Sequence, residues 1–585
     1  MKPILSRWSL RAALAAALTT LPAALSAQAQ DPWAALWRPR THNPTPTTAA
    51  ITAADLMTRL YPFADDSMGG RLMGSLGNFK GVEYIANELA SFGLEPAGEK
   101  GTFFQTVPVV TRSFDSTSTF AVGGTALQAW VDYLPRDQGA GARSVDRVRA
   151  IYGGTWGNPA SLISAEAAAG KLVVLSIGPP ERGSRIPAGT VSRAEVADHF
   201  QAAAGIAVVG LDYIPKPNMR SYQAPSEGVA PDQSPAAPTF MYITGRVATL
   251  LLGGLPDSLK AGALGKAATG SPRFAERALG YPARNVVGIL RGSDSTLRGE
   301  FVAFGGHNDH IGMGTPVAHD SMYVLNHLFR QGGADDPDPH PGPAEMVRIN
   351  ESLAQIRQAT NGASARIDSI YNGADDDGSG SVSLLEIAQY FSSLALKPKR
   401  SLVFVWHVGE EEGLYGSEYF TDHPSVPRDS IVAQLNIDMI GRGGSGDVTG
   451  QTKEGGRIHG DADYVQLIGS RRLATEYGNL AEMVNQASAH PLHFDYALDA
   501  NGHPQNIYCR SDHYEYARYG IPIVFFTTGG HADYHQVTDE PQYIDYDRMA
   551  RVAQFVAALG TRVANLDHRL VVDQPKPDPH GQCRQ

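Results

Sequence analysis

Short, continuously apolar runs alternate with amphipathic segments along the second half of the chain. Runs without polar alternation are typical of strands that are buried on both faces of a sheet. They occur at 286–290, 301–304, 402–406, 431–437 and 521–526. Apolar residues recur at helical spacing in 382–391 and in 546–559. This alternation predicts an α/β domain with a mixed, mostly parallel sheet.

A block of different character, residues 106–280, separates this pattern from an amphipathic helix expected at 78–92. Its apolar runs at 171–177 and 205–210 predict more strands, yet it carries none of the acid and histidine motifs described below. We therefore expect residues 51–105 and 281–565 to form one domain, which 106–280 interrupts as a smaller, β-rich domain.

A long connection, residues 314–372, lies inside the second part of the α/β domain. It contains a Pro- and Asp-rich stretch, 333–341, that must be a loop, followed by a helix-like segment, 344–358. Connections of this length are usually functional or disordered. We expect 314–372 to be a lid-like insertion.

Both ends of the sequence suggest segments outside the fold. Residues 1–29 combine Lys2, Arg7 and Arg11 with an apolar stretch and small residues that suit cleavage, as in a signal peptide. A retained anchor helix is the alternative, which the shortness of the stretch and Pro22 disfavour. Residues 30–50 read as a Pro-rich linker, and 566–585 as a mobile tail. The composition predicts export to the periplasm or the extracellular space.

The net charge bears on the kinds of partner the protein can bind, and the two cysteines bear on whether it contains a disulfide. The net charge is −11, and removing 1–29, with its three positive charges, makes the net charge of the remaining chain still more negative. This balance argues against nucleic acid or an anionic membrane as a partner. Export would permit a disulfide between Cys509 and Cys583. Because Cys583 lies in the Pro-rich tail, we expect two free thiols.

Acids and histidines stand where the apolar runs end. In open α/β sheets, ligands bind beyond the carboxyl ends of the strands, so these side chains are candidates to meet in one crevice. They include nitrogen and oxygen donors but no cysteine, which suits zinc. The candidates are His307, Asp376, Glu410, Glu411, Asp438 and His535.

Each candidate has a plainer interpretation. His307 could be a satisfied core histidine, although Asp309, two residues on, is placed to accept its second ring N–H. Glu410 and Glu411 could belong to a solvated acidic turn; next to a metal, one would coordinate and the other would shuttle protons. Asp438 interrupts an apolar strand and needs a partner. We interpret His310 as structural.

The stretch around Asp376 also fits another metal. Asp375, Asp377, Ser379, Ser381 and Glu386 fall on ligand positions of an EF-hand calcium loop. That loop requires an entering helix, and residues 371–374 are a poor end for one. A zinc site remains favoured.

The order and context of these residues resemble the secreted two-zinc aminopeptidases, whose relatives include glutamate carboxypeptidases, the transferrin-receptor ectodomain and glutaminyl cyclases. The matching motifs are His-x-Asp at 307–309, Gly-Ala-Asp-Asp-Asp-x-Ser-Gly at 373–380, Glu-Glu-x-Gly-Leu-x-Gly-Ser at 410–417, Asp438, Tyr508 with Ser-Asp-His at 511–513, and His535. The resemblance covers 281–565 well. It implies a three-layer α/β/α catalytic domain. It also implies that 106–280 is a domain similar to the protease-associated domain of these proteins.

The resemblance also implies roles. One zinc ion takes His307 and Asp438, the other takes Glu411 and His535, and Asp376 bridges the two. A water shared by the cations attacks the scissile carbonyl, Glu410 acts as general base and acid, and Tyr508 helps to hold the oxyanion. The bridging acid should precede a cis peptide bond, Asp376–Asp377. The disulfide that flanks the tyrosine in small bacterial members is missing, because Asn506 and Arg510 occupy its positions.

Several functions remain open. Peptide or protein substrates are expected, but the same fold serves non-catalytic receptors, cyclases, carboxypeptidases and dipeptidases. A carboxypeptidase needs a cation to hold the substrate carboxylate, and neither Arg442 nor Arg510 is marked by its context. An aminopeptidase needs acids to receive an ammonium group, and Glu410, Asp438 and Asp512 are available. We therefore favour an aminopeptidase.

Overall fold

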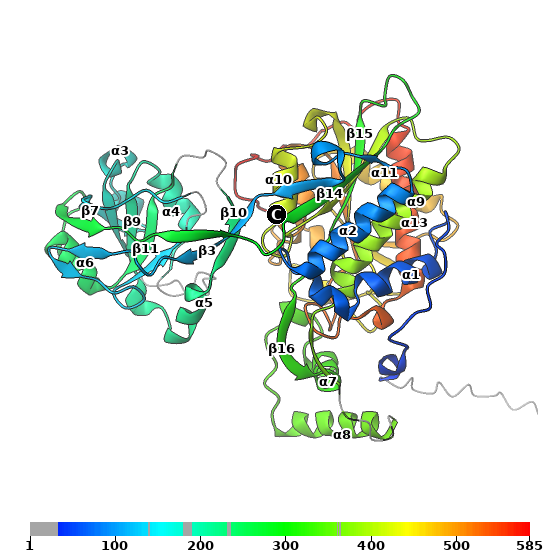
Figure 1. Ribbon diagram of the computed structural model, residues 1–585, viewed down its shortest axis with the longest axis horizontal. Coiled ribbons are helices and arrows are strands. Elements are labelled where there is room, and N and C mark those ends of the chain that lie inside the picture. Colours follow the sequence, from blue (N-terminus) through cyan, green and yellow to red (C-terminus); the bar gives the residue numbers. More distant parts are fainter. Residues whose placement is uncertain are drawn as a thin grey trace, which may run out of the picture.

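A computed structural model describes residues 33–585, apart from 138–140, 179–189, 231–235, 360, 362, 363 and 365. The expected signal peptide, 1–29, lies outside the described residues. Figure 1 shows a large body built around one sheet, a smaller body beside it, and an arm that projects from the large body. None of the described helices is long and apolar enough to cross a membrane.

The large body contains a nine-stranded mixed sheet, as the apolar runs predict. Parallel pairing is concentrated in its centre, where the strand order is β18-β15-β19-β24, while β14 and β22 join antiparallel on either side. The strands along the path are β1 (Glu95–Pro96), β14 (Ala283–Leu290), β18 (Ser401–His407), β15 (Phe301–His307), β19 (Ile431–Ile437), β24 (Ile523–Thr527), β22 (Tyr464–Ile468) and β23 (His493–Asp495), and β2 (Phe104–Val107) pairs with β14.

Helices cover both faces of this sheet, which gives the expected three layers. One apolar core joins a sheet face to α1 (Ala53–Phe63), α2 (Leu76–Ser91), α9 (Gly380–Ser393), α11 (Thr475–Gln486) and α13 (Tyr546–Ala564). A second core joins the other face to α10 (Tyr415–Asp422) and α12 (His513–Ala517). In α13 the residues Met549, Val552, Val556 and Leu559 are fully buried, so the apolar stripe seen in the sequence is the buried face.

The smaller body has its own sheet and two apolar cores of its own. The sheet runs β5 (Thr125–Ala126), β4 (Phe120–Val122), β12 (Leu264–Gly270), β7 (Arg149–Trp156), β8 (Leu172–Ile177), β9 (Gly205–Val209), β11 (Thr239–Ile243) and β6 (Tyr133–Arg136). Its helices are α3 (Ala165–Ala168), α4 (Arg193–His199), α5 (Met219–Gln223) and α6 (Gly245–Leu252). A separate three-stranded sheet, β10 (Ser226–Val229), β3 (Val109–Phe114) and β13 (Phe274–Ala278), leads toward the large body (Figure 1).

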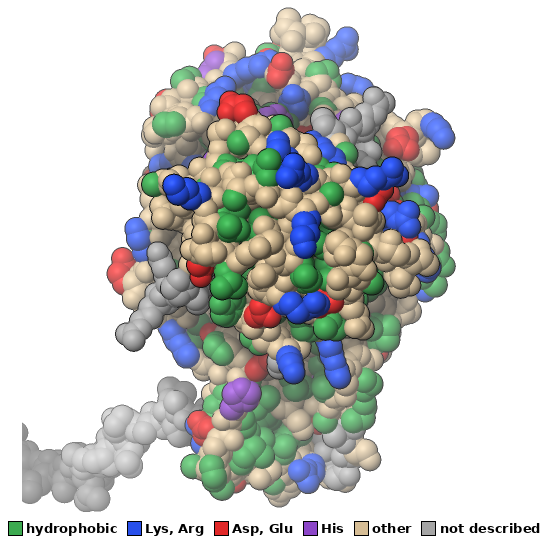
Figure 2. Space-filling view, turned by 90° about the vertical axis from the view of Figure 1, so that its left-hand side faces the viewer, with side chains coloured by type: hydrophobic (Ala, Val, Ile, Leu, Met, Phe, Trp, Pro, Cys, Tyr) green, Lys and Arg blue, Asp and Glu red, His purple; other side chains and the backbone are tan. Residues whose placement is uncertain are grey.

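The projecting arm lies in the segment 314–372, for which a lid-like insertion is expected. It comprises β16 (Met313–Ala318), α7 (His319–Phe329), α8 (Pro343–Ala359) and β17 (Ile367–Ile370), and β16 pairs antiparallel with β17. Figure 2 shows hydrophobic side chains gathered on the lower, projecting part of the molecule. Met313, Met346, Val347 and Ile367 are exposed apolar residues of the arm.

The two ends of the arm are fastened together at its base. Tyr371 N donates to Gly312 O (3.0 Å), and Gly312 N donates to Gly70 O (3.0 Å). The buried Arg71 guanidinium donates to Asn372 O (2.6 Å) and to Gly373 O (2.8 Å). The segment before α2 therefore holds both ends of the arm.

The expectation of two free thiols is wrong, and the tail is not a free end. Cys509 and Cys583 form a disulfide. Gln585 N donates to Asn506 Oδ1 (3.1 Å), which fixes the end of the tail against the large body. Composition predicted mobility because prolines and polar residues give no apolar pattern. The attachment instead uses a disulfide and backbone hydrogen bonds, which such a pattern does not record.

Candidate metal centre

The five residues expected to bind metal come together in two groups. Three of them, His307, Asp376 and Asp438, form one group. The second group contains Asp376, Glu411 and His535, joined by His310. Within each group the possible ligand atoms all lie within 4.8 Å of one another. Asp376 belongs to both groups, as a bridging ligand must.

Neighbouring parallel strands explain why these residues meet. His307 is the last residue of β15, Asp438 follows β19, and Glu410 and Glu411 follow β18. Because β18, β15 and β19 are adjacent and parallel, their carboxyl ends share one edge of the sheet. His535 arrives on the loop after β24, the next strand along.

The donor atoms fit metal ions better than they fit one another. His307 Nε2 lies 3.1 Å from Asp376 Oδ1 and 3.6 Å from Asp438 Oδ1. His535 Nε2 lies 2.8 Å from Asp376 Oδ2 and 3.0 Å from Glu411 Oε2. Yet the Nε2 atoms of His307 and His535, and Oδ1 of Asp438, are buried without a hydrogen bond. Buried polar atoms without partners are costly, and converging imidazole and carboxylate groups are what a zinc pair requires.

The turn that carries Asp376 is built by backbone amides. Asp377 accepts hydrogen bonds from His307 N (3.0 Å), Gly380 N (2.9 Å) and Met439 N (3.2 Å). Asp539 accepts from the backbone amides of Asp375 (3.0 Å) and Asp376 (3.2 Å). The peptide bond Asp376–Asp377 is cis, as the resemblance predicts.

The calcium-loop hypothesis is wrong. Asp377 is occupied by backbone amides, as described above. Glu386 forms a buried ion pair with Arg59, so its carboxylate does not reach the metal groups.

Burial and neighbouring charges shift the pKa values of residues in the site. Burial alone lowers the pKa of His307, but the carboxylates of Glu410 and Asp438 outweigh it and raise that pKa well above its usual value. Burial works to raise the pKa of Asp376, whereas its contacts with His307 and His535 hold it well below its usual range. Burial, reinforced by Asp438 and Glu411, raises the pKa of Glu410 well above that of an exposed glutamate, although His307 opposes the shift.

Glu410 lies at the site without joining either group. Its Oε2 is 3.9 Å from His307 Nε2, and its carboxylate faces the cavity over the metal groups. Asp309 supports this arrangement differently from the expectation. His307 Nδ1 faces the backbone O of Asp309 (3.2 Å), and the Asp309 carboxylate instead accepts the Glu410 backbone N–H (3.3 Å).

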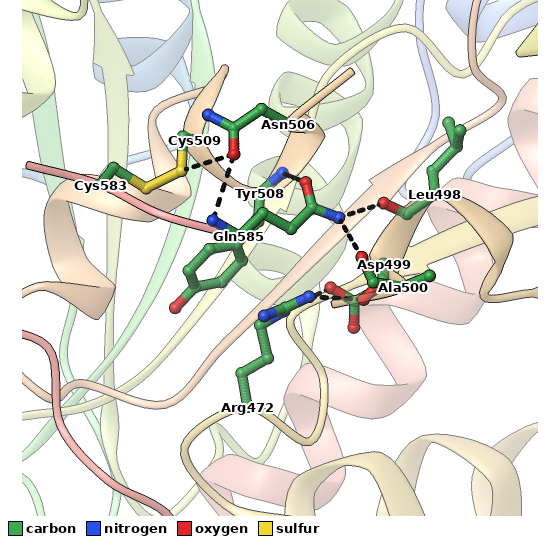
Figure 3. The surroundings of a disulfide bond; sticks show 9 residues. All are labelled: Arg472, Leu498, Asp499, Ala500, Asn506, Tyr508, Cys509, Cys583 and Gln585. Carbon is green, nitrogen blue, oxygen red and sulfur yellow. Dashed lines mark hydrogen bonds and ion pairs between the residues drawn. A yellow bond between two sulfur atoms is a disulfide. The ribbon is translucent and has the colours of Figure 1, made fainter. Parts of the chain in front are cut away.

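Sequence reasoning missed His310 and misplaced Tyr508. His310, interpreted as structural, places Nδ1 2.7 Å from Glu411 Oε1. The sequence offered one indication of this contact: His310 lies three residues after His307, just beyond the end of β15. Tyr508 is buried in the second apolar core with Arg472 over its ring at 4.6 Å (Figure 3), and it is not among the residues that line the cavity. It therefore no longer qualifies as an oxyanion partner.

The cavity opens onto the metal groups and has mixed walls. Its base contains Asp376, Glu410, Glu411 and Asp438. Apolar wall residues are Met439, Val448, Leu498, Ile507 and Phe525. Polar wall residues include Asp335, Asp336, Gln451, Arg457, Gln505, Arg510 and Tyr534. Asp335 and Asp336 come from the arm, so the insertion reaches the cavity.

Arg510 and Tyr534 connect the arm to the metal centre. Arg510 forms a two-pronged ion pair with Asp335, at 3.0 and 3.2 Å, and also donates to the Tyr534 hydroxyl (3.2 Å). Ala334 N donates to Tyr534 O (3.0 Å). Tyr534 directly precedes the ligand candidate His535, so a contact from the arm ends one residue away from the metal groups.

Two groups of possible metal ligands that share one carboxylate, set at the ends of parallel strands, are the arrangement that two-metal hydrolytic centres use. Residues 362–560 match the family model of Peptidase family M28. The matched segment contains Asp376, Glu410, Glu411, Asp438 and His535, whereas His307 precedes it.

Curated proteins match shorter parts of the chain. The chain is similar to leupeptin-inactivating enzyme 1 of Streptomyces exfoliatus, 42% identical over 82 residues, which is 14% of this chain and 19% of the relative. It is also similar to leucine aminopeptidase 1 of Coccidioides posadasii (strain C735), 29% identical over 201 residues, which is 33% of this chain and 47% of the relative. The chain thus spans less than half the length of these curated relatives.

Solved structures resemble the chain over a greater length. An aminopeptidase from Aneurinibacillus sp. strain AM-1 is 15% identical, covers 90% of this chain and 97% of its own, and gives a TM-score of 0.44. A zinc aminopeptidase from Bacillus subtilis is 14% identical, covers 88% and 95%, and gives a TM-score of 0.39.

Proposed function

We propose that this protein is a zinc-dependent aminopeptidase. The observation that carries the proposal is the pair of largely buried donor groups that share Asp376. His307 and Asp438 would hold one zinc ion, and Glu411 and His535 the other. Two zinc ions held there would acidify a water molecule and polarise the scissile carbonyl.

The residues around the two groups have distinct tasks. Glu410 takes the proton of the attacking water and passes it to the leaving amine, for which its raised pKa suits it. His310 orients Glu411 through their 2.7 Å contact. Ser511 does the same for Asp438, donating to its Oδ2 at 2.8 Å. Tyr534, which faces the cavity beside His535, replaces Tyr508 as the hydroxyl offered to the developing oxyanion.

The pairing of the arginine side chains near the metal groups supports attack at the N-terminal end of the substrate. Arg442 is buried and paired with Asp533 (2.8 Å), and Arg510 is held by Asp335. Arg457, which also lines the cavity, donates to Gln331 (2.6 Å). These guanidinium groups are engaged, while acids surround the metal groups. This balance favours a substrate ammonium over a substrate carboxylate.

Paired peptides test the direction. An aminopeptidase cleaves a C-amidated peptide, spares the N-acetylated form of the same sequence, and stops when a chelator removes zinc. The reverse pattern, read by mass spectrometry, would identify a carboxypeptidase. Ammonia release from N-terminal Gln without peptide cleavage would identify a cyclase, and zinc binding without turnover a receptor.

Export and domain roles are part of the same proposal. The features of residues 1–29 support a signal peptide, and the disulfide Cys509–Cys583 suits an oxidising compartment such as the periplasm or the extracellular space. We further propose that 106–280 is a protease-associated domain, which the separate cores of the smaller body support. Peptides or proteins are the proposed substrates.

A further inference from the structure

One wall of the cavity is a loop with little regular structure. We name residues 497–510 the wall loop. It contributes Leu498, Gln505, Ile507 and Arg510 to the cavity lining, and its only described helical pieces are the short 3-10 turns Ala497–Asp499 and Ile507–Cys509. The loop therefore depends on outside contacts to keep its shape.

The segment 583–585 supplies several of those contacts (Figure 3). The disulfide to Cys583 attaches the loop at Cys509, between the wall residues Ile507 and Arg510. The Gln585 side chain then engages both halves of the loop. Its Nε2 donates to Leu498 O and to Ala500 O (3.2 Å), and its Oε1 accepts from Tyr508 N (3.0 Å).

The Gln585 backbone adds two more contacts. Its N donates to Asn506 Oδ1 (3.1 Å), and its O accepts from Gly502 N (2.8 Å). One residue thus makes hydrogen bonds at five places along the wall loop. Each of them reaches the loop's backbone or an amide side chain, so they fix its path rather than a single side chain.

Other contacts share the support of the wall loop with segment 583–585. On the cavity side, Gln505 Oε1 accepts from Gln451 N (3.3 Å) on β20 (Val448–Gln451). Arg472 donates to Asp499 Oδ1 (2.6 Å) near the start of the loop. In residues 507–510, side chains make the outside contacts: Arg510 pairs with Asp335, and Arg472 lies over the Tyr508 ring. The backbone there is held by Gln585, through Tyr508 N, and by the disulfide at Cys509.

We propose that Gln585 and the Cys509–Cys583 disulfide position the wall loop and thereby determine which terminal side chain the enzyme accepts. This inference rests on the proposed aminopeptidase function. The segment touches neither the metal groups nor Glu410, so it acts on substrate fit and not on the chemical step. Reduction of the disulfide releases the attachment at Cys509 and loosens the same wall.

Gln585→Glu tests the proposal, because it keeps the side-chain size but turns a carboxylate toward two carbonyl oxygens. We expect KM for the preferred aminoacyl substrate to rise about 10-fold, with kcat within about twofold of the unmodified protein. The ranking of substrates by terminal side chain should change, and zinc content should stay the same. Gln585→Ala and Cys583→Ser remove contacts without adding charge, and they should shift KM in the same direction. Arg584→Ala, an exposed neighbour, is the matched control and should change nothing.

Hydrogen exchange separates this proposal from the proposed function. In the Gln585 and Cys583 variants, the amides of 497–510 should exchange faster while those of β15 and β19 keep their protection. Unchanged exchange in the wall loop, or an unchanged KM and substrate ranking in all three variants, overturns the positioning role. Absence of zinc-dependent hydrolysis in the unmodified protein would instead overturn the aminopeptidase assignment, and the exchange result would still decide whether 583–585 holds the loop.

Discussion

The metal centre and the cavity wall over it are built in opposite ways. The metal centre takes its side chains from the ends of adjacent parallel strands and from a turn fixed by backbone amides, and its residues are largely buried. Much of the wall takes its side chains from the arm, from β20 and the strand paired with it, and from the wall loop. Each of these segments is held by a few individual contacts, such as Arg510 with Asp335.

This difference separates chemistry from substrate choice. Changes at strand ends remove donors that no other residue replaces, so they should act on metal content or on kcat. Changes in the wall alter the shape of a surface and should act on KM. Three substitutions test that division, in order of decreasing effect.

Asp376→Asn should have the largest effect, because both metal groups use this carboxylate. Zinc content should fall well below two ions per chain, and hydrolysis should fall to background. Asp438→Asn is the matched comparison, since Asp438 belongs to one group only, and it should retain about one ion. Metal analysis after dialysis measures both. An Asp376→Asn protein that still holds two ions would contradict the shared-ligand arrangement.

Glu410→Gln should leave the metals in place and remove the proton carrier. We expect kcat to fall about 10²–10⁴-fold at unchanged zinc content, the range usual for loss of a general base. Glu412→Gln, an exposed acid two residues further on, should retain normal turnover. Steady-state kinetics with metal analysis would decide the case, and a near-normal kcat in Glu410→Gln would exclude it as the base.

Asp335→Asn should have the smallest effect and should act on the wall alone. It weakens a partly exposed ion pair with Arg510, and such pairs contribute roughly 0.2–1 kcal/mol. We expect KM to change by no more than about fivefold at unchanged kcat. Asp338→Asn, a more exposed acid on the same arm, should have no effect. A large loss of kcat in Asp335→Asn would show that the arm takes part in the chemistry.

The sequence predicted the metal centre better than the wall, for a physical reason. His307, Asp438 and Glu411 follow apolar runs that become strands, and parallel strands bring their ends together whatever lies between them in the chain. The shape of the wall depends on where loops pack. Nothing in the sequence pattern around Gln585 indicated that it would bind residues 498–508, and nothing placed Tyr508 behind the wall instead of inside it.

Local sequence patterns also gave wrong predictions where the same spacing of residues is compatible with two different structures. Residues 375–386 match a calcium loop by spacing, but the stretch folds around backbone amides, and Glu386 turns to Arg59 in α1. His310 looked incidental because its contact with Glu411 joins positions a hundred residues apart. Pairs of this kind exist only in the folded chain.

The closed base of the arm has an evolutionary consequence. Since Gly312 and Tyr371 are hydrogen-bonded neighbours, the chain leaves and re-enters the large body at nearly the same point. Lengthening or shortening the segment between them changes loop-closure entropy only slowly with length. Descendants of this gene can therefore exchange the arm, and with it the wall residues Asp335 and Asp336, while His310 and Asp375 keep their places.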